Sequence, residues 1–115
     1  MPDAEWLTVP DFADRLGVTA SHVRELLRDG SLASMRRGER NTVQIPADFI
    51  VEIDGSQAVL PWLKGTLTLL RDARLGDEAA LDWLLADEPE LGMSPLEALR
   101  SGQRAHVRRL AQALL

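Results

Sequence analysis

The chain has 115 residues, which fits one domain or two very small modules that share a core. Its apolar fraction of 45% is typical of a globular protein, and its lack of cysteine excludes disulfides, thiolate zinc sites and cysteine nucleophiles. The formal net charge of −5 argues against a general nucleic-acid binder, because contacts with phosphate dominate that kind of affinity.

Nothing in the sequence indicates insertion into a membrane or export. No apolar run approaches the roughly 20 residues that span a bilayer. The acidic segment Met1–Glu5 lacks the basic and then apolar pattern of a signal peptide. We therefore expect a cytoplasmic protein with no membrane partner.

The first predicted element is a short helix that begins after Thr8. The Thr8 hydroxyl can accept a hydrogen bond as the N-cap, and Pro10 is tolerated in the first turn because its missing N–H would be unsatisfied there. Gly17 is expected to end the helix in the left-handed conformation. The exposed side is acidic (Asp11, Asp14), so this helix is a poor candidate for touching phosphate.

A second helix is predicted over residues 20–29, where three apolar residues form one narrow face at helical spacing. Thr19 is the candidate for its N-cap, and Gly30 is expected to end it. The turn of residues 17–19 between the two helices is as short as in a helix-turn-helix. The second helix is therefore available for the major groove of DNA.

After Gly30 the sequence predicts a small β-hairpin, which we call the wing. Residues 31–35 alternate weakly and could form its first strand, and residues 43–45 alternate again before Pro46 stops the strand. The glycine and asparagine of residues 36–41 favour a turn between them. Three arginines lie near the tip of this turn: Arg36, Arg37 and Arg40.

A short helix over residues 46–50 and a linker over residues 52–57 are expected before the chain becomes all-helical. Helices are then predicted to begin near residues 60, 77, 94 and 103, with Asp77 and Ser94 as caps. The first of these helices is expected to bury one broad apolar side (Trp62, Leu63, Leu67, Leu70). The final leucines (Leu110, Leu114, Leu115) suggest docking onto their own domain, which we favour, or a protein interface.

The expected fold is mainly α with a small β-hairpin wing. It comprises an N-terminal winged helix-turn-helix DNA-binding domain at residues 1–52. A C-terminal helical bundle follows as a second domain at residues 58–115, where it would serve interaction or dimerisation.

The distribution of charge singles out the second helix and the wing. Between residues 22 and 44 five arginines face three carboxylates, so this window is net +2 and the rest of the chain is −7. A basic patch on an acidic body suits a binder that needs a specific docked pose.

The exposed side of the second helix could recognise base edges from its N-terminal end, where Ser21 and His22 lie. Arginine can bond guanine in a bidentate manner or bind phosphate. The alternatives are an ordinary solvated helix face and a charged turn that keeps the protein soluble. Because the helix and the wing stand together, we favour contact with DNA. The candidate DNA-binding residues are Thr19, Ser21, His22, Arg24, Arg28, Arg36, Arg37, Arg40 and Asn41.

Catalysis is not indicated. The two histidines, His22 and His106, lie in different halves of the chain without partners at the spacing of metal ligands. The sequence shows neither a nucleophile with its base and acid nor a glycine-rich phosphate loop. We therefore expect no enzyme activity, no metal and no cofactor.

The first half of the chain resembles the winged helix-turn-helix of MerR and excisionase-type proteins. The residues that carry the resemblance are Leu16–Thr19, Val23-Arg24, Leu27, Gly30–Leu32, Arg36–Gly38 and Ile45-Pro46. MerR regulators proper also carry a long coiled-coil dimerisation helix and an effector domain, and this sequence has neither. The resemblance implies DNA binding without catalysis.

The second half resembles the C-terminal module of Xre/MbcA/ParS-type antitoxins. The matching residues are Trp83–Leu85, Glu88-Pro89, Leu91-Gly92, Ser94–Leu96, Leu99, Gly102 and Val107. The two halves in this order resemble an actinobacterial family of small DNA-binding proteins with a MerR-like N-terminus and a helical C-terminal domain.

The predicted function is sequence-specific binding of double-stranded DNA by a transcriptional regulator. The helix of residues 20–29 would enter the major groove, and the turn of residues 36–41 would lie on the adjacent backbone or minor groove. A homodimer would suit this function, because a single small module buries little surface on DNA. The alternative is an antitoxin-like adaptor whose C-terminal helices bind a partner protein.

Overall fold

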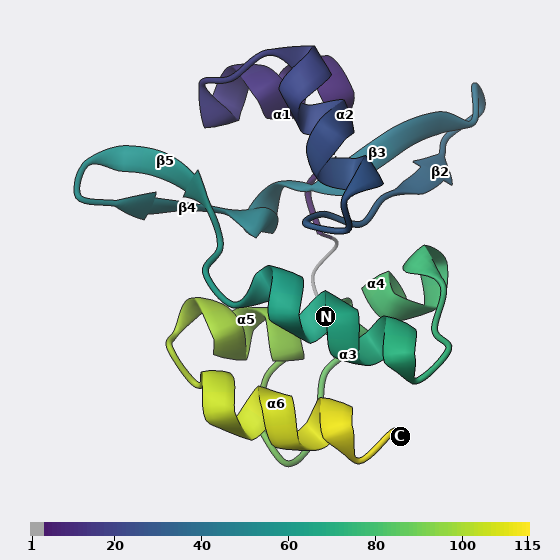
Figure 1. Ribbon diagram of the computed structural model, residues 1–115, viewed down its shortest axis with the longest axis vertical. Helices are drawn as coiled ribbons and strands as arrows, with labels where there is room; N and C mark the ends of the chain where they lie inside the picture. Colours follow the sequence, from purple (N-terminus) through teal and green to yellow (C-terminus); the bar gives the residue numbers. More distant parts are fainter. Residues whose placement is uncertain (1–3) are drawn as a thin grey trace.

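The computed structural model of the protein describes residues 4–115, so the first three residues of the acidic start lie outside the described residues. Within residues 4–115 the chain forms six α-helices, one 3-10 helix and five strands. The first two helices and all the strands make up one half, and the four remaining helices pack beneath them (Figure 1). A mainly helical chain with a small hairpin is thus confirmed in part, since the strands are more numerous than expected.

The first helix, α1 (Val9–Leu16), has the predicted ends. The Thr8 hydroxyl oxygen accepts a hydrogen bond from the Asp11 N–H at 3.3 Å, and Gly17 follows in the left-handed conformation with φ of 82°. The structure adds a short strand before the helix, β1 (Trp6–Thr8), which the sequence did not predict.

The second helix, α2 (Ala20–Arg28), is also confirmed. The Thr19 hydroxyl oxygen accepts from the His22 N–H at 3.1 Å, which makes Thr19 the N-cap. The C-cap is Asp29, so the predicted end at Gly30 is one residue late. Gly30 has φ of 83°, and the Ser31 N–H donates back to the Leu26 carbonyl at 2.9 Å, which closes the helix.

The wing is part of a three-stranded antiparallel sheet in which β3 (Thr42–Pro46) lies between β1 and β2 (Met35–Arg37). The hairpin of β2 and β3 was predicted, but its first strand was placed wrongly at residues 31–35. Leu32 and Ala33 are consecutive and both fully buried, which strand alternation does not allow, so this segment runs irregularly into the core.

The linker expected at residues 52–57 is wrong. A second hairpin occupies these residues, formed by β4 (Ile50–Ile53) and β5 (Ser56–Val59), with Ile53 paired to Ser56. Its two turn residues, Asp54 and Gly55, have φ of 53° and 81°, the conformation that Asp-Gly pairs favour in tight hairpins. The short helix before it is confirmed as a 3-10 helix, η1 (Ala47–Phe49).

Four helices follow: α3 (Leu63–Asp72), α4 (Asp77–Leu85), α5 (Pro95–Arg100) and α6 (Arg104–Gln112). Ser94 is an N-cap as predicted, because its hydroxyl oxygen accepts from the Glu97 N–H at 3.1 Å. Asp77 was wrongly predicted as a cap: Gly76 holds that position, and Asp77 is the first residue of α4.

Two predictions about apolar side chains in this half are wrong. Trp62 was expected on the buried side of α3, but it precedes the helix with φ of 68° and is 45% exposed. Leu114 and Leu115 were expected to dock onto their own domain, but they lie beyond the end of α6 and are 44% and 67% exposed. The predicted core residues of α3 (Leu63, Leu67, Leu70) are fully buried.

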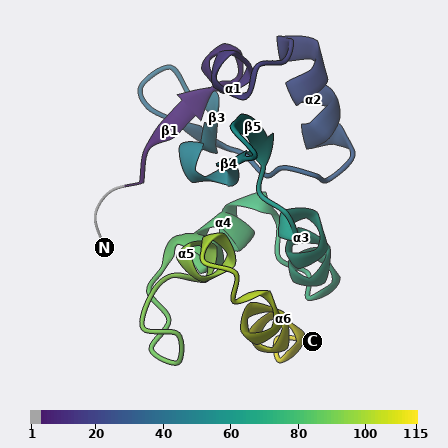
Figure 2. The same cartoon turned by 90° about the vertical axis from the view of Figure 1, so that its left-hand side faces the viewer.

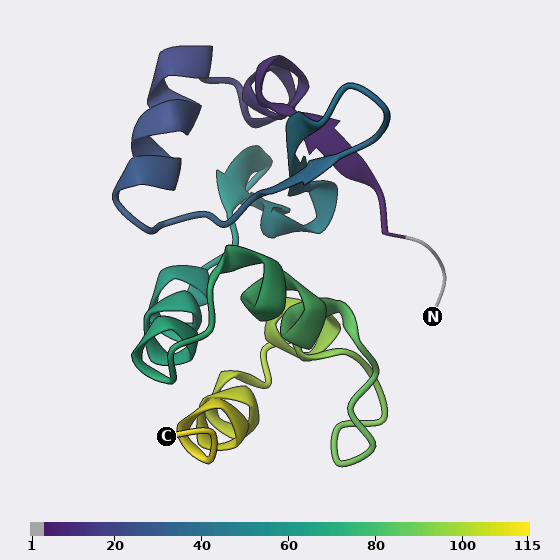
Figure 3. The ribbon, with the colours of Figure 1, turned by 90° about the vertical axis from the view of Figure 1, so that its right-hand side faces the viewer.

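One continuous hydrophobic core joins the two halves. Phe12 and Val23 of the upper helices belong to the same buried cluster as Leu67 of α3 and Val107 of α6. Figure 3 shows α2, α3 and α6 following one another along one side of the molecule. Of the helices in residues 4–115, none combines the length and the apolarity that a membrane span requires.

Candidate nucleic-acid interface

All nine side chains proposed for DNA contact are exposed. In α2, Val23 is fully buried and Leu26 and Leu27 are half-buried, so the opposite side of the helix is left to polar residues. Thr19 and Ser21 lie at the start of this helix, and the Thr19 hydroxyl is already engaged as the cap. His22 lies one residue further on, with its Nδ1 3.8 Å from a Glu25 carboxylate oxygen.

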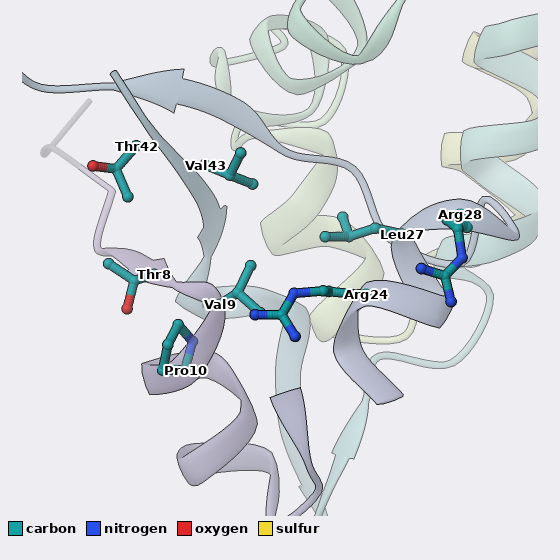
Figure 4. A pocket seen from close by; sticks show the side chains of 8 residues that line it. All are labelled: Thr8, Val9, Pro10, Arg24, Leu27, Arg28, Thr42 and Val43. Atoms are coloured by element: carbon teal, nitrogen blue, oxygen red, sulfur yellow. The ribbon is translucent and has the colours of Figure 1, made fainter. Parts of the chain in front are cut away.

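A hollow of about 440 Å³ lies between the start of α1, α2 and β3 (Figure 4). Its lining residues are Thr8, Val9, Pro10, Arg24, Leu27, Arg28, Thr42 and Val43. Arg24 extends from α2 toward Val9 and Pro10, and Arg28 lies one turn further along the same side (Figure 4). The structure thus brings two of the proposed arginines into one concave surface beside the wing.

The residues that β1, α1 and β3 contribute to this hollow were not predicted from the sequence. Thr8, Val9, Thr42 and Val43 carry no charge, and they meet α2 only because β1 pairs with β3, with Thr8 opposite Gln44. A three-residue strand leaves too short a pattern to be recognised in the sequence.

The arginines of the wing do not all face the same way. Arg36 lies opposite Val43 in the β2–β3 ladder, so its side chain lies on the same face of the sheet as Val43, one of the residues that line the hollow. It also donates to the Asn41 carbonyl oxygen at 3.1 Å, which braces the turn. Arg37 points to the other face, where its guanidinium lies 4.3 Å from the centre of the Trp6 ring. Such a cation–π contact fixes the direction of Arg37.

The arginines of α2 and the wing are free of carboxylate partners. Within residues 4–115 the ion pairs of arginine are Arg15 with Glu5 and Arg71 with Asp77, and the His22 imidazole lies beside Glu25. None of them uses Arg24, Arg28, Arg36, Arg37 or Arg40. The guanidinium charges around the hollow are therefore available to an external anion.

A fixed negative charge bounds this surface at the end of α2. The Asp29 carboxylate accepts from the Ser31 hydroxyl at 2.6 Å and from the Ser31 N–H at 2.9 Å. These two hydrogen bonds lower the pKa of Asp29, and the nearby Lys64 ammonium lowers it further. The Asp29 carboxylate therefore adds a negative charge at the end of α2, which disfavours a phosphate close to it.

The segment between α2 and β2 is held from below by the second half of the chain. Arg71 of α3 donates to the Gly30 carbonyl oxygen at 2.8 Å, to the Leu32 carbonyl oxygen at 3.3 Å and to the Asp77 carboxylate at 3.2 Å. Asp77 in turn accepts from the Ser34 N–H at 3.3 Å. The end of the helix and the start of the wing are thus both tied to α3 and α4.

A second arginine, Arg100 of α5, holds the sheet in the same manner. It donates to the carbonyl oxygens of Asp48 and Ile50 at 2.7 and 2.8 Å. We call the contacts of Arg71 and Arg100 the junction. Neither arginine was assigned a role from the sequence, because their partners are backbone carbonyls about 40 to 50 positions away.

Comparison with known proteins assigns both halves of the chain to one protein family. Residues 1–50 match a family described as the winged helix-turn-helix domain of the DNA-binding protein Rv2175c, and residues 60–115 match the Rv2175c C-terminal domain of unknown function. The DNA-binding protein Rv2175c of Mycobacterium tuberculosis is 33% identical, covering 98% of this chain and 82% of that protein. The chain belongs to the Rv2175c family.

The fold of the family agrees with the geometry described above. The NMR structure of Rv2175c aligns with a TM-score of 0.83 and 32% identity over 99% of this chain and 83% of that one. The Rv2175c winged helix-turn-helix match includes α1, α2 and the wing, and so all nine proposed residues. The expected pairing of a winged helix-turn-helix with a second C-terminal domain is confirmed at the level of this family.

Proposed function

We propose that the protein binds double-stranded DNA through α2 and the wing and regulates transcription from the bound site. The observation that carries the proposal is the set of exposed arginines around the hollow, none of which is paired with a carboxylate within residues 4–115. The relative from Mycobacterium tuberculosis is named a DNA-binding protein, and its winged helix-turn-helix domain matches this half of the chain.

The arrangement suits a helix in the major groove with its wing beside it. Ser21 and His22 lie at the leading end of α2, where side chains reach base edges. Arg24 and Arg28 follow at a spacing of one turn, so one can bond a guanine while the other binds the flanking phosphate. Arg36 faces the same side from the wing, and Arg40 and Asn41 occupy its exposed turn.

The two parts of the chain have different roles in this function. Residues 1–52 act as the DNA-binding domain, and residues 58–115 act as a second domain that supports it and serves dimerisation or interaction. The MerR-like likeness of the first part supports insertion of α2 into the major groove. A homodimer would double the surface that a single small module buries on DNA.

Replacing Arg24 and Arg28 together with alanine tests the DNA interface. A bidentate contact with guanine is worth roughly 1–3 kcal/mol and the lost phosphate contact adds to it, so we expect affinity for a duplex selected from a random pool to fall at least about tenfold. The slope of log affinity against log salt should become shallower by about one for each phosphate that the variant no longer binds. Mobility shift at several salt concentrations measures both.

The matched control is a double variant with the same change of charge elsewhere, Arg74→Ala with Arg109→Ala. Both residues are exposed and lie in the second half of the chain, so this variant should keep wild-type affinity. Thermal unfolding should be the same for both variants. Wild-type binding by the Arg24 and Arg28 variant would refute the interface.

A second candidate function is an antitoxin-like adaptor whose C-terminal helices hold a partner protein. The exposed Trp62 and the hollow of about 650 Å³ between α3 and α6 favour it, since neither belongs to the core. A salt titration of DNA binding by the whole chain separates the two functions. A steep negative slope supports DNA binding, and a flat one favours the adaptor.

A further inference from the structure

The second half of the chain is electrically polarised. Residues 77–97, which include α4 and the loop before α5, contain seven carboxylates and no lysine or arginine. Residues 101–115, which include α6, contain three arginines and no carboxylate side chain. Figures 2 and 3 show α3 and α6 together on one side of the molecule and the loop between α4 and α5 projecting on the other. The acidic loop between α4 and α5 and the basic helix α6 therefore lie on opposite sides of the molecule.

The positive side contains a groove. It has a volume of about 650 Å³ and runs between α3 and α6, where Arg104 and Arg108 stand one turn apart. The Arg104 guanidinium lies 4.8 Å from the centre of the Trp62 ring, and Leu69 adds an apolar wall. Neither arginine forms an ion pair within residues 4–115. Its occupant should carry carboxylates beside an apolar side chain.

The loop of residues 87–91 on the negative side has this chemistry. Asp87 and Glu90 are exposed, and Pro89 and Leu91 supply apolar surface between and beside them. The loop is also rigid, because the Glu88 N–H donates to the Met93 carbonyl at 3.0 Å and the Gly92 N–H donates to the Glu88 carbonyl at 2.9 Å. A loop that is already shaped loses little conformational entropy when it binds.

We propose that the groove between α3 and α6 receives the loop of residues 87–91 of a second copy of this chain. The two surfaces lie on opposite sides, so a chain cannot fill its own groove. The contact is head-to-tail, and each added copy leaves a free groove at one end and a free loop at the other. The proposal does not depend on DNA binding, although copies held on neighbouring DNA sites would meet at high effective concentration.

A duplex is a poorer occupant for this groove. The surface between two neighbouring helices has Trp62 and Leu69 on its walls, whereas the backbone of a duplex presents mainly charged phosphates to a protein surface. If Arg104 and Arg108 bind phosphate instead, replacing them should lower the affinity for DNA and leave the self-association of the chain unchanged. The two outcomes can therefore be told apart.

Two variants test the contact, one on each surface. The groove variant is Arg104→Glu with Arg108→Glu, and the loop variant is Asp87→Asn with Glu90→Gln, which leaves no charge that the altered groove could attract. All four side chains are exposed, so the fold should survive, which circular dichroism checks. Sedimentation velocity without DNA is run at about 0.1 M salt, where the repulsion between whole chains of charge −5 is screened but contacting pairs persist.

The wild-type chain should show a mass that rises with concentration beyond that of a dimer. Each variant alone should lose self-association by at least about tenfold in the association constant. A mixture of the two variants retains one intact groove and one intact loop, so it should form dimers and nothing larger. A symmetric dimer would instead stop at twice the monomer mass in the wild-type chain.

Several results would overturn the proposal. A wild-type chain that stays monomeric at all concentrations refutes it, as does a mixture that remains monomeric. Loss of DNA affinity in the groove variant with no change in mass would assign the groove to DNA. None of these outcomes depends on whether α2 binds DNA, which is tested separately by the affinity of the Arg24 and Arg28 variant for DNA.

Discussion

The arginines around α2 and the wing differ from those at the junction in what their N–H groups meet. Arg71 and Arg100 donate to backbone carbonyls of the other half, and Arg71 also pairs with Asp77. Arg24 and Arg28 line an open hollow with no carboxylate partner within residues 4–115. The same side chain thus stabilises the fold where its donors are used and remains available to a ligand where they are not. Substitutions at the junction should therefore lower the free energy of unfolding, whereas substitutions of Arg24 and Arg28 should lower only the affinity for DNA.

The largest effect on stability is expected from Arg71→Ala. The substitution leaves two carbonyl oxygens without the Arg71 donor and Asp77 without its ion-pair partner, and hydrogen bonds to charged groups are worth roughly 1.5–3 kcal/mol. We expect the free energy of unfolding to fall by about 2–3 kcal/mol. DNA affinity should also fall, because Arg71 positions the segment between α2 and β2.

Urea unfolding measures the effect, and Arg74→Ala is its control. Arg74 lies three residues further along, is exposed and forms no ion pair within the described residues. Its removal should change the free energy of unfolding by less than about 0.5 kcal/mol. Equal stability of the two variants would contradict the structural role of the junction.

A smaller effect is expected at the wing, where substitutions of two neighbouring arginines should differ in their effects on DNA affinity and on stability. Arg36 lies on the face of the sheet that carries Val43, and Arg37 lies against Trp6 on the opposite face. Arg36→Ala should lower DNA affinity by about tenfold, the value of one good contact, and Arg37→Ala should lower it less. Arg37→Ala should instead cost about 0.5–1 kcal/mol of stability, because it removes the cation–π interaction with Trp6. Fluorescence anisotropy with one labelled duplex, alongside urea unfolding, compares them. The reverse order of affinities would place DNA on the other face of the wing.

The smallest effect is expected at the exposed pair of Glu5 and Arg15. Hydrogen bonds from Arg15 lower the pKa of Glu5 below its ordinary value of 4.5 in the folded chain. The pair therefore contributes stability above pH 4.5 and loses that contribution as the pH falls through the lowered pKa. The difference in free energy of unfolding between wild type and Glu5→Gln should shrink between pH 7 and pH 3. A difference that is independent of pH would exclude this pair as its source.

What could be predicted from the sequence depended on how far apart the interacting residues lie. The caps at Thr8, Thr19 and Ser94 were correctly predicted, because each hydroxyl meets an N–H three residues later. The Asp54-Gly55 turn was a local signal as well, but a linker was predicted there, and the strands on either side have only four residues each, which is a short pattern to recognise.

The errors concern residues whose place is set by distant partners. Leu32 and Ala33 turn into the core that both halves share, so a strand pattern could not describe them. Trp62 looked like a helix core residue by spacing, but α3 begins one residue later and leaves the ring on the surface. The nine proposed DNA contacts are all exposed, and their contact with DNA stays a prediction. That Arg36 and Arg37 face opposite sides follows only from the register of the sheet.

The bond from Arg71 to Gly30 also bears on the order in which the molecule folds. A side chain at residue 30 would place its Cβ only 2.8 Å from the Arg71 guanidinium, so the glycine leaves room for a partner 41 positions later in the chain. During synthesis, α1 and α2 can form from local contacts before that partner exists. The segment between α2 and β2 can form its hydrogen bonds with Arg71 only after α3 has been synthesised and has packed against it. The first half of the chain is therefore synthesised before the residue that anchors its path into the wing.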